Sequence, residues 1–327
     1  MPHIDIHAHW YPEEWVALLE AEAPGIGAKM GRNERGQVTF AMPQYKATFQ
    51  RSYIDLVARL HAMDEARVDV HALSLTQPMV YWAPLEFGLK LARVYNDGLA
   101  AAHERYPDRF MGLATLPMQA PELAVEEAQR ASALPGIRGV YLATHVMGKN
   151  LDEPEFRPVF ACCEALGLPV FLHPVNPVGA DRMRKYHLRN FIGNTTETGI
   201  AAASLIFGGV LDAYPKLDVV LPHAGGVLPA LIGRMDHGAT VRSELAHLKR
   251  PPSSYLRRFH YDTISHDDVA LMNLIRQVGV DRVVMGSDCP ADMSYTQPVD
   301  VVERLSALSR SERQAVLGGN AARLLKI

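Results

Sequence analysis

The sequence predicts an α/β fold, specifically a (β/α)8 TIM barrel with a small insertion after the first strand. Short apolar runs of strand-forming residues alternate with helical stretches along the chain, a pattern that favours parallel strands joined by right-handed crossovers. There are eight such runs, and 327 residues suffice for one barrel with additions. An open doubly wound sheet is the alternative. No Gly-x-Gly-x-x-Gly motif follows the first expected strand, which weakens a dinucleotide-binding role.

The expected elements divide the whole chain, 1–327, into one barrel domain. In chain order, the strands are expected at 3–7, 68–75, 110–116, 139–144, 169–173, 219–222, 260–264 and 282–286. Helices between them are expected at 54–66, 85–105, 121–133, 158–165 and 197–213, where apolar residues recur at helical spacing. Helices over 298–308 and 312–317 are expected to close the barrel, followed by a short helix over 320–325.

The main departure from a minimal barrel is the segment 10–52, which follows the first expected strand. Within it, residues 36–42 have the pattern of part of a small hairpin. In a barrel, the segment after a strand lies on the C-terminal face, where active sites are built. We therefore expect 10–52 to act as a lid over the active site.

Composition and charge argue against several classes of partner. The net charge is −3, with 48% hydrophobic and 21% charged residues, which indicates neither nucleic-acid binding nor attraction to an anionic membrane. No apolar run approaches the ~20 residues of a membrane span, and a signal-peptide pattern is absent. The odd set of cysteines, Cys162, Cys163 and Cys289, argues against a disulfide framework. We expect a mature cytoplasmic protein.

Two histidines near the N-terminus are placed to bind a metal. His7 and His9 end the first expected strand, and side chains at i and i+2 of a strand point to the same face. Two imidazoles held on one rigid element can chelate a transition metal. His173, His223 and Asp288 end the fifth, sixth and eighth expected strands. All five residues therefore lie on the face where barrel active sites are built.

The joint pattern predicts a mononuclear metal site. A lone histidine at a strand end is more often a hydrogen-bonded core or loop residue, and an aspartate after Gly-Ser often caps a helix. Candidates at four strand ends at once are much harder to reach by chance. Three imidazoles and one carboxylate suit Zn²⁺, with Fe²⁺, Co²⁺ or Mn²⁺ as alternatives. Such a metal lowers the pKa of a bound water toward ~7, and a nearby histidine that is not a ligand can move the proton.

Longer motifs over nearly the whole chain resemble a known family. They are Asp5-Ile6-His7-Ala8-His9, Tyr81-Trp82, Gly112-Leu113-Ala114-Thr115-Leu116-Pro117-Met118-Gln119, Arg182-Met183-Arg184-Lys185-Tyr186, Glu197-Thr198, His223-Ala224-Gly225-Gly226, Gly233-Arg234 with His237-Gly238, and Gly286-Ser287-Asp288. In combination they resemble the amidohydrolase superfamily, specifically its aminocarboxymuconate-semialdehyde decarboxylase-like branch. The resemblance implies a (β/α)8 barrel with one divalent metal, usually zinc.

The resemblance also implies roles for single residues and a partner. By matching motifs, the implied metal ligands are His7, His9, His173 and Asp288. His223 is the implied acid/base next to the metal-bound water. In this branch an arginine reaches the substrate carboxylate from the neighbouring subunit, and Arg234 lies in the matching motif. A homodimer that shares Arg234 across its interface is therefore implied, with a small carboxylic acid as substrate.

Four further positions are candidates for substrate contacts. The branch has an arginine of the same subunit in the excursion after strand one, where Arg51 is the best match and Lys46 the next. A solvated surface charge is an equally good interpretation of either residue. His187 occupies a position where the decarboxylase carries an aromatic residue that lines the pocket. Trp82 comes from the shared Tyr81-Trp82 motif.

Three functions fit these residues. The resemblance favours non-oxidative decarboxylation of an unsaturated or aromatic carboxylic acid, with His223 moving the proton. The second function is hydrolysis of an ester, lactone or amide at the same site, with Asp288 accepting a proton. The third is a non-catalytic metal-stabilised or ligand-binding barrel, which His223 argues against because it lies beyond the four implied ligands.

Overall fold

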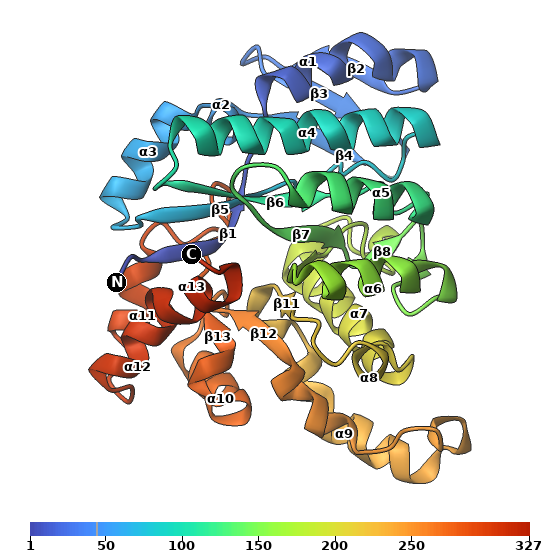
Figure 1. The fold of residues 1–327 in the computed structure, drawn as a ribbon, viewed down its shortest axis with the longest axis vertical. Coiled ribbons are helices and arrows are strands. Elements are labelled where there is room, and N and C mark those ends of the chain that lie inside the picture. The colour runs from blue at the N-terminus through green and yellow to red at the C-terminus, as the bar shows by residue number, and fades with distance from the viewer. Residues whose placement is uncertain (44) are drawn as a thin grey trace.

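The chain folds into a barrel of eight parallel strands surrounded by helices, as Figure 1 shows. The computed structural model describes residues 1–43 and 45–327. Around the barrel the strands follow the order β1 (Ile4–His9), β5 (Val70–Ser74), β6 (Phe110–Thr115), β7 (Ile137–Ala143), β10 (Val170–His173), β11 (Val219–Leu221), β12 (Phe259–Asp262) and β13 (Val283–Val284). The predicted (β/α)8 barrel is confirmed, and the open doubly wound sheet is not.

Hydrogen bonds between β1 and the segment after β13 close the sheet on itself. The N–H of Ile6 donates to the carbonyl of Met285 at 3.0 Å, and the N–H of His9 donates to the carbonyl of Cys289 at 2.7 Å. The N–H of Asp288 in turn donates to the carbonyl of His7 at 2.8 Å. This closure places the first strand of the sheet, β1, next to the segment after the last strand, β13. The β1 histidines therefore lie close to Asp288.

Helices cover the outside of the barrel (Figure 1). They include α3 (Leu56–Glu65), α4 (Leu85–Arg105), α5 (Pro121–Ser132), α6 (Arg157–Leu166), α7 (Thr195–Phe207), α8 (Val210–Ala213), α10 (Asp268–Val278) and α11 (Pro298–Glu303). Local signals begin several of them. The side chains of Asp55 and Asp267 accept main-chain N–H groups in the first turns of α3 and α10. Pro121 opens α5, where a missing N–H is tolerated.

Some elements differ from the predictions. β1 extends through His9, beyond the predicted 3–7, and β13 covers only part of the predicted 282–286. The predicted helix 197–213 divides into α7 and α8, because Gly209 takes a left-handed φ of 71° between them. The helices that were not predicted include α1 (Glu13–Glu22), α9 (Leu228–Val241) and α10.

The segment between β1 and β5 forms a small antiparallel sheet with flanking helices. Its elements are α1, β2 (Lys29–Arg32), β3 (Val38–Ala41), β4 (Lys46–Phe49) and α2 (Arg51–Ile54). Residues 36–42, predicted as part of a hairpin, hold β3, which pairs with both β2 and β4. Aromatic contacts attach this unit to the barrel: Phe40 lies 4.7 Å from Trp82 and Trp15 lies 6.4 Å from Tyr95, measured between ring centroids.

Apolar side chains fill the barrel below the catalytic face. Alternate strand residues such as Ile6, Val70 and Leu113 form one buried cluster. Leu324 and Leu325 of α13 (Asn320–Leu325) pack into the same cluster, so the last helix seals the end of the barrel opposite the site. Among the described residues, no helix combines the length and apolar character that a membrane crossing requires.

Candidate metal centre and active site

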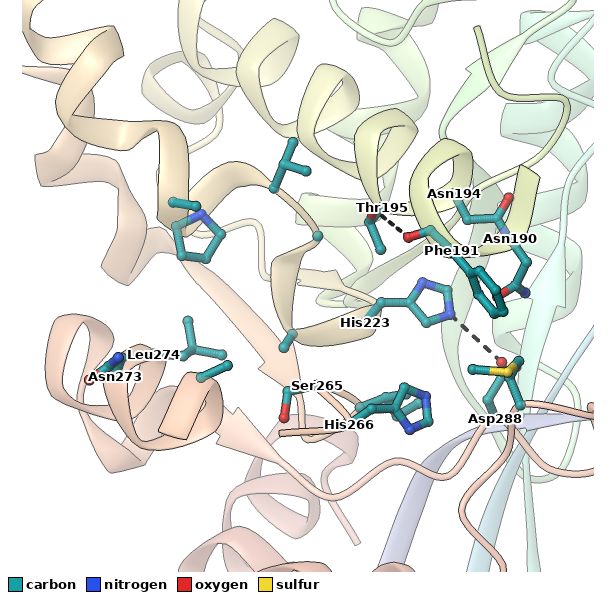
Figure 2. Close-up of a pocket in the computed structure, with 18 of the residues that line it drawn as sticks. Asn190, Phe191, Asn194, Thr195, His223, Ser265, His266, Asn273, Leu274 and Asp288 are labelled. Carbon is teal, nitrogen blue, oxygen red and sulfur yellow. Dashed lines mark hydrogen bonds and ion pairs between the residues drawn. The ribbon is translucent and has the colours of Figure 1, made fainter. Parts of the chain in front are cut away.

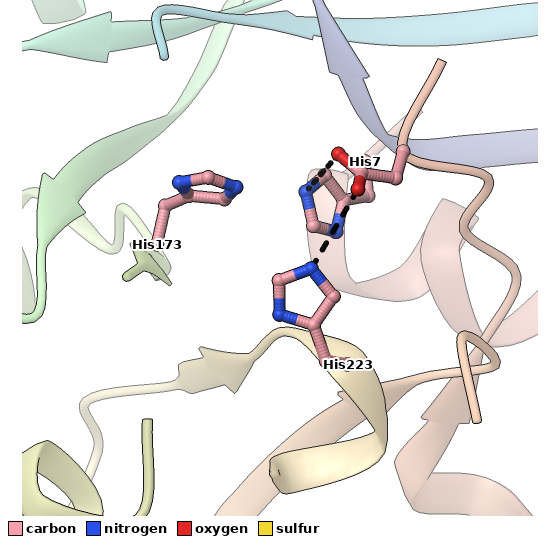
Figure 3. Close-up of side chains that lie close together, drawn as sticks. His7, His173 and His223 are labelled. Carbon is pink, nitrogen blue, oxygen red and sulfur yellow. Dashed lines mark ion pairs between the residues drawn. The ribbon is translucent and has the colours of Figure 1, made fainter. Parts of the chain in front are cut away.

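Four histidines and one aspartate converge at the C-terminal ends of the barrel strands. His7 and His9 come from β1, His173 ends β10, and His223 and Asp288 follow β11 and β13. The ring centroid of His9 lies 5.0 Å from that of His7 and 4.8 Å from that of His173. The ring of His223 lies 5.3 Å from that of His7, and Figure 3 shows the imidazoles of His7, His173 and His223 around a common space. The fold thus brings together all five residues that the sequence singled out.

Hydrogen bonds orient both β1 histidines. His7 Nδ1 lies 2.8 Å from Asp262 Oδ2, and an ionised carboxylate can only accept, so Nδ1 carries the proton. His9 Nδ1 lies 3.0 Å from Ser74 Oγ, whose own proton goes to the carbonyl of Ala8 at 3.1 Å. With Nδ1 held in this way, the Nε2 of His7 faces the interior of the site, whereas the Nε2 of His9 contacts Oδ1 of Asp288 at 3.0 Å.

Burial and hydrogen bonding decide the charges in the site. Burial lowers the pKa of His9 to about 4 and also lowers the pKa of His173, so both imidazoles are neutral near pH 7. Burial alone would raise the pKa of Asp288, but hydrogen bonds from neighbouring imidazoles hold it well below its usual range. Burial also opposes a charged His7, yet the hydrogen bond from His7 to Asp262 raises the pKa of His7. This makes the Nε2 of His7 a more basic metal ligand.

These residues fit one divalent metal ion. Single ligand atoms of His7, His173, His223 and Asp288 all lie within 4.8 Å of one another. Among the described residues the buried Nε2 of His7 has no hydrogen-bond partner, a costly state that a metal would relieve. His9 reaches the same group through Asp288, with its Nε2 3.0 Å from Oδ1. Imidazole nitrogens together with a carboxylate oxygen are ligands that Zn²⁺ and other first-row divalent ions accept.

Asp262, at the end of β12, organises the site and lies outside the predicted set of site residues. Besides its bond to His7, its carboxylate accepts the main-chain N–H groups of His223 at 2.9 Å and Ala224 at 2.8 Å. Both of these residues have a φ of 53°, a strained left-handed conformation that the carboxylate stabilises. A signal was present in the sequence: Asp262 is a carboxylate within the expected strand 260–264, near its C-terminal end.

A cavity of about 270 Å³ opens over the metal-binding residues and includes His9, His173, His223 and Asp288 in its walls. Polar side chains from the segment between β1 and β5 and from the loops after β5 and β10 line most of the rest. They are Tyr11, Lys46, Thr48, Gln50, Tyr53, Thr76, Gln77, Asn190 and Asn194. Among the predicted substrate contacts, the fold therefore places Lys46 at the site.

The other predicted substrate contacts lie elsewhere. Arg51 lies in α2, where it pairs with Asp55 at 2.9 Å and its side chain is 88% exposed. His187 is exposed, Trp82 is buried, and Arg234 is exposed on α9. Within the part of the chain that the structure describes, none of these four lines the cavity of about 270 Å³.

Comparison with known proteins connects this geometry to a family. The family model described as Amidohydrolase matches residues 4–327. The 2-amino-3-carboxymuconate-6-semialdehyde decarboxylase of Dictyostelium discoideum is 34% identical, over 98% of this chain and 91% of its own. The crystal structure of 5-carboxyvanillate decarboxylase from Sphingomonas paucimobilis is similar with a TM-score of 0.85 and 28% identity, covering 100% of this chain and 99% of that chain.

A further solved structure holds a metal. The dihydroxybenzoic acid decarboxylase from Polaromonas sp. JS666, with bound manganese and the inhibitor 2-nitroresorcinol, is 27% identical with a TM-score of 0.82. The alignment covers 99% of this chain and 97% of that chain. With a family match over the whole barrel and a relative 34% identical across it, the chain belongs to the amidohydrolase family, in its aminocarboxymuconate-semialdehyde decarboxylase-like branch.

Proposed function

We propose that this protein is a metal-dependent, non-oxidative decarboxylase of an unsaturated or aromatic carboxylic acid. The observation that carries the proposal is the convergence of the imidazoles of His9, His173 and His223 with Asp288 and Lys46 on one polar cavity, with His7 beside them. The named relatives support it, because all three are decarboxylases and belong to, or share the fold of, the same family.

We assign one divalent metal, Zn²⁺ by preference, to His7, His9, His173 and Asp288. The neutral imidazoles of His9 and His173 and the ionised carboxylate of Asp288 support this assignment, and the manganese in the Polaromonas relative makes Mn²⁺ the chief alternative. When bound, such an ion stabilises negative charge that develops on the substrate.

In this proposal His223 holds and moves the proton. Its Nε2 lies 3.7 Å from Oδ2 of Asp288, beside the metal-binding residues. Lys46 binds an anionic group of the substrate and fixes its orientation. When the bond to the carboxyl carbon breaks, CO2 leaves and its electron pair remains on the substrate. The proton of His223 then takes the place of the carboxylate, so one proton is consumed for each CO2 released.

The hydrolase alternative uses the same residues, with Asp288 accepting a proton from water that attacks a carbonyl. The comparisons do not favour it, because the named relatives are decarboxylases. Product analysis separates the two reactions. CO2 release without uptake of solvent oxygen supports decarboxylation, whereas incorporation of ¹⁸O from labelled water without CO2 supports hydrolysis.

We further propose a homodimer in which Arg234 reaches the substrate carboxylate of the neighbouring subunit. Figure 1 shows α9, which carries Arg234, extending away from the barrel. Leu231 and Val241 of the same helix are 41% and 61% exposed, an apolar surface that a second subunit can cover.

Subunit complementation tests this arrangement. The variants Arg234→Ala and His223→Asn are each expected to be nearly inactive. In a mixed dimer, one site combines an intact His223 with the intact Arg234 of the other chain. Activity that returns on mixing and refolding supports the shared site, and two variants that stay inactive together contradict it.

Two further assignments belong to this proposal. The insertion 10–52 acts as a lid, which is supported by Lys46, Thr48 and Gln50 in the cavity wall. A reducing compartment, the cytoplasm, is the proposed location, consistent with free thiols at Cys162, Cys163 and Cys289.

The decisive experiment joins elemental analysis of the purified protein to a CO2-release assay over a panel of unsaturated and aromatic acids. About one metal per chain, as a mononuclear site requires, together with CO2 release is the expected result. Metal without CO2 from any acid would move the assignment to a hydrolase. A protein purified without metal, and unable to bind added Zn²⁺ or Mn²⁺, would contradict the proposed centre.

A further inference from the structure

Two cavities meet at the metal centre. The cavity of about 270 Å³ is lined by His9, His173 and His223, and a second cavity of about 620 Å³ runs from there toward α9 and α10. The residues that line both are Asn190, Asn194, His223 and Asp288. Figure 2 shows both asparagines on a helical turn close to His223 and Asp288. A substrate that approaches His223 and Asp288 from either cavity therefore lies beside the side-chain amides of Asn190 and Asn194.

Neighbouring residues, not the two amides themselves, anchor this turn. Asn190 and Asn194 belong to the π-helical segment Arg189–Asn194 that precedes α7. Arg189 ties the segment to the loop after β10 by donating to the Oδ1 of Asn176 at 2.6 Å. Gly193 packs so closely that an added Cβ would lie 2.7 Å from Pro177. Widened turns of this kind occur frequently at functional sites.

The side chains of Asn190 and Asn194 are available to a ligand. Within residues 1–43 and 45–327, neither amide makes a side-chain hydrogen bond, and both residues are partly buried. Each amide offers one carbonyl acceptor and two N–H donors. An amide is uncharged, so it suits a neutral hydroxyl or carbonyl better than a carboxylate. Lys46, in the wall of the smaller cavity, supplies the cation for an anionic group.

We infer that Asn190 and Asn194 are specificity-determining residues that bind a neutral hydrogen-bonding group of the substrate, such as a ring hydroxyl. The inference rests on the proposed function and adds to it the residues that select the acid. A bare hydrocarbon ring would leave both amides without partners once water is excluded, and a site built to bind a hydroxyl discriminates strongly against an analogue that lacks it.

Binding of two probe acids to the metal-loaded protein tests the inference. The probes are 2,6-dihydroxybenzoate and benzoate, which differ only in the hydroxyls, and Kd is measured by titration calorimetry. The wild type is expected to bind 2,6-dihydroxybenzoate more tightly. Asn190→Leu and Asn194→Leu are each expected to weaken that binding about tenfold, the value of one lost hydrogen bond of about 1.4 kcal/mol. The Kd of benzoate is expected to stay within about twofold.

Matched controls keep the test specific. Asn273→Leu replaces an asparagine of α10 that lines only the larger cavity, and it is expected to leave both Kd values unchanged. Asn190→Gln retains an amide and is expected to recover part of the preference. Metal content and melting temperature show whether each variant is folded. A wild type that binds 2,6-dihydroxybenzoate no better than benzoate, or leucine variants that weaken both probes equally, overturns the inference.

The outcomes also separate this inference from the proposed reaction. CO2 release by the wild type with unchanged probe selectivity in the leucine variants leaves the decarboxylase intact and removes the role of the asparagines. A selectivity change without CO2 release from any acid keeps the role of the asparagines in binding and removes the proposed reaction.

Discussion

The Nδ1 atom of His7 lies 2.8 Å from the Oδ2 atom of Asp262, although 255 positions separate the two residues in the chain. The same carboxylate accepts the N–H of His223, the implied acid/base. One buried side chain thus orients a β1 histidine and holds the loop that carries a second histidine. A carboxylate behind a metal-binding imidazole fixes its tautomer and raises its basicity.

Replacing Asp262 by asparagine is therefore expected to weaken metal binding about 10- to 100-fold. An asparagine can still accept the N–H of His223, but it no longer provides the anionic acceptor for His7. Chelator competition gives the metal Kd. The matched control is Asp218→Asn, which alters another aspartate–histidine pair, with His260 at 3.1 Å, outside the set of metal-binding residues. An unchanged metal Kd in Asp262→Asn would contradict the role of Asp262 in supporting the metal-binding His7.

Replacing His223 by asparagine is expected to lower kcat at least ~100-fold, the usual contribution of general acid–base catalysis. Metal content is expected to remain about one per chain, because the four assigned ligands are intact. Steady-state CO2 release and elemental analysis measure the two quantities. His61→Asn, at an exposed position of α3, is the control for loss of an imidazole. Loss of the metal together with activity would instead make His223 a ligand, in place of His9.

Lys46 and Arg51 are expected to behave differently when each is replaced by methionine. Lys46→Met removes a cation from the cavity wall and is expected to raise KM about tenfold or more, since a hydrogen bond to a charged group contributes about 1.5–3 kcal/mol. Arg51→Met breaks only an exposed pair with Asp55, and both KM and stability are expected to stay nearly unchanged. A raised KM in Arg51→Met together with an unchanged KM in Lys46→Met would instead make Arg51 the substrate-binding cation.

Adjacent cysteines of α6 are expected to differ in reactivity. Burial raises the pKa of the Cys163 thiol to about 12, and Cys163 is fully buried. The charged thiolate is the reactive form, so at pH 8 only ~1 in 10⁴ of this thiol can react. Cys162 is partly exposed, and burial raises the pKa of its thiol as well. Native labelling with iodoacetamide, followed by peptide mass spectrometry, is expected to modify Cys162 first and Cys163 only after unfolding. Equal labelling of both in the native protein would contradict the packing of α6.

Local patterns in the sequence were enough to predict the barrel and the centre of the site. Helix α4 (Leu85–Arg105) has the predicted bounds, because apolar residues recur at helical spacing over a long stretch and form one apolar face. His7, His9, His173, His223 and Asp288 were predictable from their positions at strand ends, since all parallel strands of a closed barrel present those ends on one face. The metal site thus follows from the order of elements along the chain.

Only the tertiary structure decided which other side chains reach that site. Lys46 and Arg51 are five positions apart in the sequence, yet the end of the insertion sheet puts one in the cavity wall and leaves the other in solvent. Trp82 belongs to a motif shared with the family, but it packs against Phe40 of the insertion. The pairing of Asp262 with His7 depends on closure of the barrel. Strand ends are set by local periodicity, whereas these contacts depend on how distant segments pack, which no local pattern records.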